Sequence, residues 1–152
     1  MLRRLYFYQE TSVMKSILFV CIHNSARSQM AEAFINHRFG DRFHAKSAGL
    51  ESGTLNPVVV EAMKEIDIDI SNNATKTVDD ILATKESFDY VVTVCDEANA
   101  ERCPVFPGPG ERIHWGFPDP SALQGAADDK LARTRVIRDA IQDRLSAWAS
   151  SV

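Results

Sequence analysis

The chain has 152 residues, 45% of them hydrophobic, and a formal net charge of -4 at pH 7. A chain of this length and composition folds most simply as one domain. Nucleic acids and anionic membranes attract clustered Lys and Arg, and the sequence has no such run and no long apolar segment, which argues against nucleic-acid binding and against a membrane protein.

The first thirteen residues differ in pattern from the rest of the chain. We interpret residues 1–13 as an N-terminal extension and a candidate for disorder, because a coherent strand pattern begins only at Lys15. Gln9 and Glu10 interrupt a short apolar run before the core of a signal peptide could form. Residues 14–152 are then expected to be a single catalytic domain in the cytoplasm, where its three cysteines stay reduced.

A strand followed directly by a helix is predicted at the start of this domain. Residues 16–20 form an almost wholly apolar run, typical of a strand buried on both faces of a parallel sheet. From Arg27 to about Phe39 the apolar residues fall on one helical stripe, and Gly40 then supplies a stop.

A second strand and helix follow in the same order. Residues 44–48 are predicted to form the strand. Asn56 and Pro57 are typical of the N-cap and the first residue of a helix, which we expect to run to roughly Ile66. Its apolar stripe includes Val59, Val60, Met63 and Ile66.

The remaining elements complete an alternating pattern. Thr77 and Asp80 have the spacing of a capping box for a short helix to about Lys85. Residues 88–94 and 112–115 are predicted strands, and an apolar stripe marks a C-terminal helix at Ile137, Ile141, Leu145 and Trp148. We therefore predict an α/β fold: an open four-stranded parallel sheet with helices on both faces.

The segment between the last two strands has little regular period. Residues 95–110 contain Cys95, Cys103 and five Pro or Gly residues. A loop of this length in a compact domain usually moves or carries function.

The junction of the first strand and helix has the pattern C-x5-R. Cys21 ends the strand, Arg27 opens the helix, and five residues form the turn: Ile22, His23, Asn24, Ser25 and Ala26. Such a turn points backbone N–H groups at a tetrahedral oxyanion, which the helix dipole and the planar Arg27 fork also favour. We predict that residues 21–28 bind a tetrahedral oxyanion such as phosphate or sulfate.

The same field makes Cys21 a candidate nucleophile. Positive charge and N–H groups stabilise a thiolate over a thiol, and the Ser28 hydroxyl can donate a further hydrogen bond. The Asn24 amide can tie the loop together. The alternative is that Cys21 is a buried strand-end cysteine and Arg27 a surface residue, but strand, turn, Arg27 and helix in this order favour the catalytic interpretation.

Residues 20–32, VCIHNSARSQMAE, resemble the active-site loop of low-molecular-weight tyrosine phosphatases and of the arsenate reductases that share their fold. The sequence Arg-Ser-Gln-Met, where phosphatases usually have Arg-Ser-Pro, leans toward the reductases. Further segments agree with this assignment: Ser47–Gly49, Glu61–Glu65 and His114–Phe117. The resemblance runs from about Met14 to the end of the chain.

The resemblance implies a general acid and a thiol relay. Asp119, in an Asp-Pro pair, matches the residue that protonates the departing oxygen, although Ser121 follows where phosphatases typically have Tyr. Reducing arsenate takes two electrons, which Cys95 and Cys103 are expected to supply as a disulfide that thioredoxin or a similar thiol reductant reopens. This chain encloses seven residues between these cysteines, one more than its best-known thioredoxin-linked relatives. It also has Ala26 where many relatives have a second cysteine in the oxyanion-binding turn.

No tightly bound cofactor is expected. The cysteines and histidines lack zinc-site spacings such as C-x2-C, so we predict no metal centre. Some relatives hold potassium at positions that match Asn24, Glu32 and Ser47, with an acidic residue where this chain has Lys76. The ammonium group of Lys76 is expected to replace that ion's charge.

Two other functions use the same loop. A low-molecular-weight tyrosine phosphatase would use Cys21, Arg27 and Asp119 but pass its intermediate to water. A non-catalytic oxyanion-binding or redox-sensing module would keep the loop and dispense with Asp119. The paired cysteines and Ser121 favour the arsenate reductase.

Overall fold

A parallel sheet forms the centre of the computed structural model, which describes residues 14–152; the predicted extension over residues 1–13 lies outside the described residues. The strands lie in the order β2-β1-β3-β4. Their bounds are β1 (Lys15–Cys21), β2 (Phe43–Gly49), β3 (Tyr90–Thr93) and β4 (Glu111–His114). All three neighbouring pairs are parallel, which confirms the predicted sheet.

Strand β1 lies inside the sheet, and Ile17, Leu18, Phe19 and Val20 are all fully buried. This matches the apolar run from which the strand was predicted. Strand β3 is shorter than the predicted 88–94. At its start, the backbone of Phe88 forms hydrogen bonds with residues 107 and 110, in the turn that precedes β4. Strand β4 begins and ends one residue earlier than predicted.

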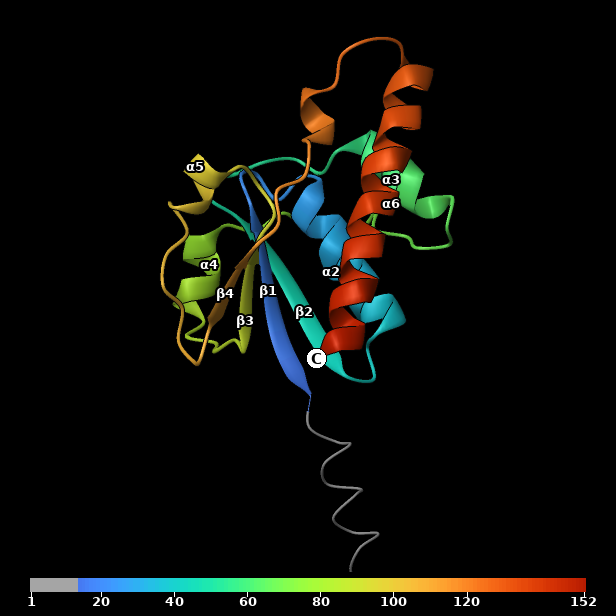
Figure 1. Cartoon of the computed structure of the whole chain (residues 1–152). Coiled ribbons are helices and arrows are strands. Elements are labelled where there is room, and N and C mark those ends of the chain that lie inside the picture. The colour runs from blue at the N-terminus through green and yellow to red at the C-terminus, as the bar shows by residue number, and fades with distance from the viewer. Residues whose placement is uncertain (1–13) are drawn as a thin grey trace, which may run out of the picture.

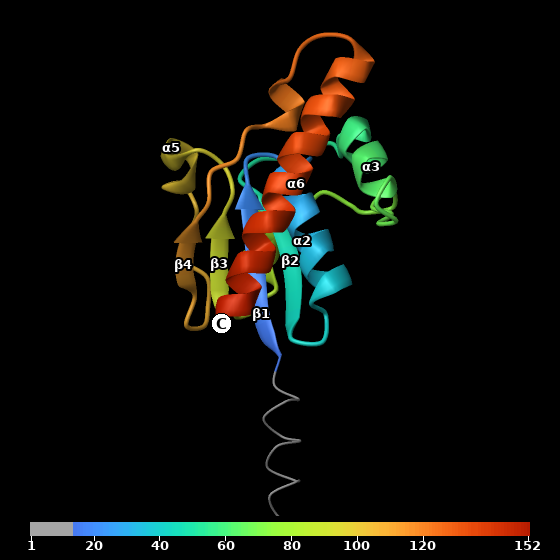
Figure 2. The same cartoon turned by 45° about the vertical axis from the view of Figure 1, so that its right-hand side comes forward.

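Helices cover both faces of the sheet, as predicted (Figures 1 and 2). Helices α2 (Arg27–Arg38), α3 (Pro57–Lys64) and α6 (Ala127–Ser151) lie on one side, and α4 (Val78–Ala83) lies on the other. Asn56 caps α3 by accepting hydrogen bonds from the N–H groups of residues 58 and 59, and Thr77 and Asp80 form both bonds of the capping box of α4. The caps predicted from the sequence are therefore present.

Two short helices were not predicted. Helix α5 (Glu97–Ala100) lies within the segment 95–110, where the Asp96 side chain accepts a hydrogen bond from the N–H of Asn99. The 3-10 helix η1 (Pro120–Ala122) begins at the Asp-Pro pair. None of the helices within residues 14–152 has both the length and the apolar character that crossing a bilayer requires.

The sheet separates two hydrophobic clusters. The larger cluster packs α2, α3 and α6 against one face and includes Cys21, Phe34, Met63 and Ile141. The smaller cluster packs α4 and the segment before β4 against the other face and includes Phe88, Phe106 and Cys103. Cys21 and Cys103 thus belong to different clusters.

Helix α6 should stabilise the chain mainly through its buried stripe. Ile141 is fully buried, whereas Val136 on the same helix is 69% exposed. Ile141→Ala is expected to lower the free energy of unfolding by about 2–5 kcal/mol, because it leaves a cavity. The matched control Val136→Ala should change it by no more than about 0.5 kcal/mol. Urea unfolding followed by circular dichroism checks both, and equal losses would contradict the assigned packing.

Candidate active site

The oxyanion loop, residues 21–28, lies at the carboxyl end of the sheet between β1 and α2. Backbone hydrogen bonds attach it to the segment after β2, from Leu50 N to Cys21 O (3.0 Å) and from Glu51 N to Ile22 O (2.8 Å). The loop is therefore held by the neighbouring strand as well as by its own helix.

Two glycines allow this close contact. A Cβ atom at Gly49 would lie 2.6 Å from the backbone carbonyl carbon of His23. One at Gly53 would overlap the His23 carbonyl oxygen and lie 2.6 Å from the His23 Cβ. These separations are far below contact distance. Only glycine fits at these positions unless the oxyanion loop moves.

The sulfur of Cys21 has two hydrogen-bond partners. It lies 2.8 Å from Ser28 Oγ and accepts from the backbone N–H of Asn24 at 3.2 Å. Because Asn24 Nδ2 already donates to Ser28 Oγ at 2.8 Å, the single hydroxyl hydrogen of Ser28 is free to point at the sulfur. Two hydrogen-bond donors can therefore point at the Cys21 sulfur.

The buried side chain of Asn24 joins the loop to three other segments. Its amide nitrogen also donates to Ser47 Oγ at 2.9 Å, and its oxygen accepts from Gln29 Nε2 at 3.1 Å and from Lys76 N at 3.0 Å. All four hydrogen-bonding positions of the amide are thus used. Asn24 has a φ of 56°, in the left-handed region, and these bonds hold it there.

Arg27 and Asp119 meet beside the loop. Arg27 is 5% exposed, and its Nη2 lies 3.6 Å from Asp119 Oδ2 while its Nη1 donates to the carbonyl oxygen of Phe117 at 3.1 Å. Within residues 14–152, the buried Nε of Arg27 has no acceptor. A buried donor without a partner is costly, so an oxyanion at this point would satisfy it.

Ser121 and Asn56 hold residues 119–122, called here the Asp119 segment, in place. The sequence did not indicate that these two residues are in contact. Asp119 Oδ1 accepts from the backbone N–H of Ser121 at 2.9 Å. The Ser121 hydroxyl accepts from Asn56 Nδ2 at 3.0 Å and lies 3.4 Å from the Ser25 hydroxyl of the oxyanion loop. The contacts of Ser121 with Asn56 and Ser25 join segments more than sixty residues apart, so no local sequence pattern predicts them.

Cys95 and Cys103 are both free and buried. Burial raises the pKa of Cys95 to about 11; the positive charge of Arg27 opposes this shift, and charge on Cys21 adds to it. Thr93 pairs with Val20, and Val94 N donates to Val20 O at 2.9 Å, so Cys95 leaves β3 beside the end of β1 where Cys21 lies. Burial also raises the pKa of Cys103, which packs in the smaller hydrophobic cluster on the other face. The structure thus brings Cys95 near Cys21 but places Cys103 apart.

The positions considered for potassium are already joined by hydrogen bonds. Besides its bond to Asn24, Ser47 Oγ donates to Glu32 Oε1 at 3.0 Å. The ammonium of Lys76 donates to the carbonyl oxygen of Ala74 at 3.2 Å. The Asn24 oxygen already accepts two hydrogen bonds, so these residues as arranged do not fit a cation. In the part of the chain that the structure describes, no group of three His, Cys, Asp or Glu side chains could hold a metal ion.

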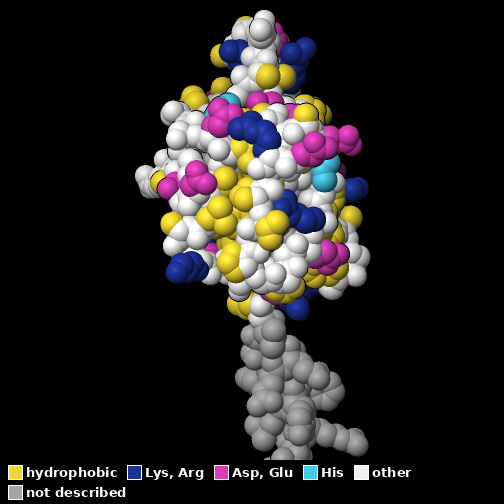
Figure 3. All heavy atoms as spheres, turned by 90° about the vertical axis from the view of Figure 1, so that its left-hand side faces the viewer, with side chains coloured by type: hydrophobic (Ala, Val, Ile, Leu, Met, Phe, Trp, Pro, Cys, Tyr) yellow, Lys and Arg dark blue, Asp and Glu magenta, His cyan; other side chains and the backbone are white. Residues whose placement is uncertain are grey.

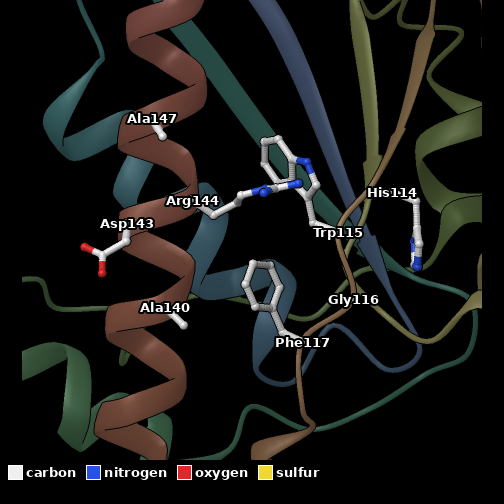
Figure 4. A pocket seen from close by; sticks show the side chains of 8 residues that line it. All are labelled: His114, Trp115, Gly116, Phe117, Ala140, Asp143, Arg144 and Ala147. Carbon is white, nitrogen blue, oxygen red and sulfur yellow. The ribbon is translucent and has the colours of Figure 1, made fainter.

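A groove of about 660 Å³ lies between residues 114–117 and α6 (Figure 4). The guanidinium of Arg144 lies over the Trp115 ring, 5.4 Å from its centroid. The groove is lined by His114, Trp115, Gly116, Phe117, Ala140, Asp143, Arg144 and Ala147. Phe117, whose carbonyl holds Arg27, thus belongs to both this groove and the site.

Known proteins are similar to this chain in sequence and in fold over nearly its whole length. The sequence is 45% identical to the arsenate reductase of Bacillus subtilis over 90% of this chain and 96% of that protein. A solved arsenate reductase in an oxidized state has a TM-score of 0.72 at 27% identity and covers 88% of this chain and 95% of its own. Another, in a phosphate-binding state, has a TM-score of 0.66 at 27% identity and covers 91% of this chain and 99% of its own.

The family described as low molecular weight phosphotyrosine protein phosphatase matches residues 16–152, which include the oxyanion loop, Asp119 and all three cysteines. The fold of this chain is the predicted four-stranded parallel sheet with helices on both faces. By this match and by its likeness to the arsenate reductases, the chain belongs to the low molecular weight phosphotyrosine protein phosphatase family.

Proposed function

We propose that this chain is an arsenate reductase that binds arsenate in the oxyanion loop and reduces it with its own thiols. The observation that carries the proposal is the Cys21 sulfur, which has two hydrogen-bond partners. It lies in a loop with Arg27, whose Nε lacks an acceptor among the described residues. The likeness to arsenate reductases over 90% of the chain supports reduction over ester hydrolysis.

The first step forms a bond between Cys21 and arsenic. The Cys21 thiolate attacks arsenate while Arg27 and the loop N–H groups hold its oxygens. Asp119 donates a proton to the departing hydroxide, which leaves as water. The distance of 3.6 Å between Asp119 Oδ2 and Arg27 Nη2 supports this role, because Arg27 holds the anion in the proposed complex. The product is an arsenic(V) adduct on Cys21.

The next two steps carry the electrons outward. The Cys95 thiolate attacks the Cys21 sulfur, the sulfur–arsenic bond breaks with its electron pair on arsenic, and arsenite leaves. Cys103 then attacks Cys95, releases the Cys21 thiolate and leaves a Cys95–Cys103 disulfide. Thioredoxin, or a similar dithiol, reduces this disulfide and restores the enzyme.

The relay requires residues 95–102 to rearrange. Disulfide formation needs Cα atoms within about 7 Å, and Cys95 has to bond first to Cys21 and then to Cys103, which lies in the smaller cluster on the other face. Helix α5 has only four residues, so its unfolding costs little. Val105 is 84% exposed, and hydrophobic side chains gather on the face toward α4 and α5 (Figure 3). This face is the proposed contact for the reductant.

The variant Cys103→Ser tests whether Cys103 is needed for more than one turnover of arsenate reduction. With arsenate, thioredoxin, thioredoxin reductase and NADPH, the unmodified chain is expected to consume NADPH continuously. The variant should release about one arsenite per chain and stop with a Cys21–Cys95 disulfide, because no third thiol resolves it. NADPH absorbance and arsenite yield check this. A chain that hydrolyses aryl phosphates but consumes no NADPH in response to arsenate would be a phosphatase.

Asp119→Asn tests the general acid. The variant should lower the single-turnover rate by about 10²–10⁴-fold, because the amide cannot donate the proton. Sulfate affinity should hold or rise, since a negative charge beside the anion is removed. Asp129→Asn, in the first turn of α6, is the matched control and should change neither. A loss of sulfate binding equal to the loss of rate would contradict the assigned role.

Potassium should have little effect on this chain. Exchanging sodium chloride for potassium chloride at constant ionic strength is expected to leave the rate and the melting temperature unchanged, because the amide and hydroxyl oxygens are already hydrogen-bonded. Lys76→Asp provides the comparison, since it restores an acidic residue beside Asn24 and should introduce a response. Marked potassium activation of the unmodified chain would refute this interpretation.

A further inference from the structure

Arg112 of β4 reaches across to the residue that carries the third thiol. Its Nη2 donates to the carbonyl oxygen of Cys103 at 3.0 Å and to that of Pro104 at 2.6 Å. The Cys103 sulfur lies 3.7 Å from the same Pro104 oxygen. One guanidinium nitrogen therefore holds the carbonyls of both the thiol's own residue and the next.

The charge of Arg112 also acts on the thiol. Burial raises the pKa of Cys103, and the charge and hydrogen bonding of Arg112 oppose that shift. Both residues line a hollow of about 360 Å³, together with Thr93, Glu101 and His114. Glu101 and His114 are the other titratable groups of this hollow. Within residues 14–152, no carboxylate forms an ion pair with Arg112.

The adjacent Arg102 has a different position. Its guanidinium pairs with Glu51 at 3.1 Å and also donates to Asn99 at 2.8 Å. Both members of this pair are about half exposed, so the pair contributes little to stability. Arg102 has the same charge as Arg112 and precedes Cys103 directly, but it forms no hydrogen bond to the carbonyls that Arg112 holds.

We propose that Arg112 is a positioning residue for the resolving thiol, one that holds residues 103–104 and stabilises the Cys103 thiolate. This role rests on the proposed relay. In that step Cys103 loses its proton to water in the hollow, and its sulfur bonds to the Cys95 sulfur. The Cys21–Cys95 bond breaks, Cys21 leaves as a thiolate, and no net electrons are gained or lost.

Alkylation of Cys103 tests the proposal without arsenate. The reduced chain is treated with iodoacetamide from about pH 6 to about pH 11, and the Cys103 peptide is quantified by mass spectrometry. Arg112→Gln should move the pH midpoint of the Cys103 alkylation rate upward by about one unit. Well below the midpoint this makes the reaction roughly tenfold slower, because the thiolate fraction falls by that factor. Arg112→Lys should recover much of this shift because it keeps the charge. Arg102→Gln is the matched control and should leave the midpoint unchanged.

Two results would overturn the role of Arg112. One is an alkylation midpoint that does not move in Arg112→Gln. This includes a rate that changes by the same factor at every pH, because such a change reports only the exposure of the Cys103 thiol. The other is an equal shift in Arg102→Gln. Melting temperatures confirm that the variants are folded, and Arg112→Lys keeps the test valid if the glutamine variant is not.

A single turnover with arsenate connects the thiol to the relay. Arg112→Gln should accumulate the Cys21–Cys95 disulfide, while the unmodified chain proceeds to Cys95–Cys103. Arsenite yield in that first turnover should be equal in both, because Arg112 acts after arsenite has left. If the unmodified chain reduces no arsenate, the proposed function fails while the alkylation result on Arg112 still stands.

Discussion

The amide of Asn24 is the constraint on which the site depends. The residue has the left-handed backbone needed for the turn between β1 and α2, and its side chain bonds to Ser28, Gln29, Ser47 and the backbone of Lys76. Such backbone conformations cost of order 1–3 kcal/mol and persist only when their surroundings determine them. Here the surroundings are β2, α2 and the segment before α4. The oxyanion loop is therefore rigid before any ligand arrives.

Rigidity at the loop contrasts with the arrangement of the cysteines. Cys21 lies in the larger cluster, three residues before Asn24. Cys103 lies in the smaller cluster and is part of a segment rich in Pro and Gly. The proposed chemistry needs both properties, since arsenate must be held still while the thiols move. The parallel sheet separates the two functions, because the oxyanion loop and the cysteine segment leave different strands at the same edge.

The sequence predicted what depends on neighbouring residues. The apolar run of β1, the Asn56 cap and the capping box at Thr77 are local patterns, and each has the predicted structure. The contact of Ser121 with Asn56 could not be predicted, because it depends on how the Asp119 segment folds over α3. Helix α5 was missed because its only local signal, Asp96 as a cap, lies in a segment rich in Pro and Gly. The separation of Cys103 from Cys21 follows from the faces of the sheet, which residue spacing does not reveal.

The burial of Cys95 has a consequence for survival under oxidative stress. Peroxides attack the thiolate form of cysteine, and a pKa of about 11 leaves almost none of that form near neutral pH. Burial also raises the pKa of Cys103, although the charge of Arg112 opposes this shift. A cell exposed to arsenic and to peroxides together would thus lose little of Cys95 to oxidation before arsenate has bonded to Cys21.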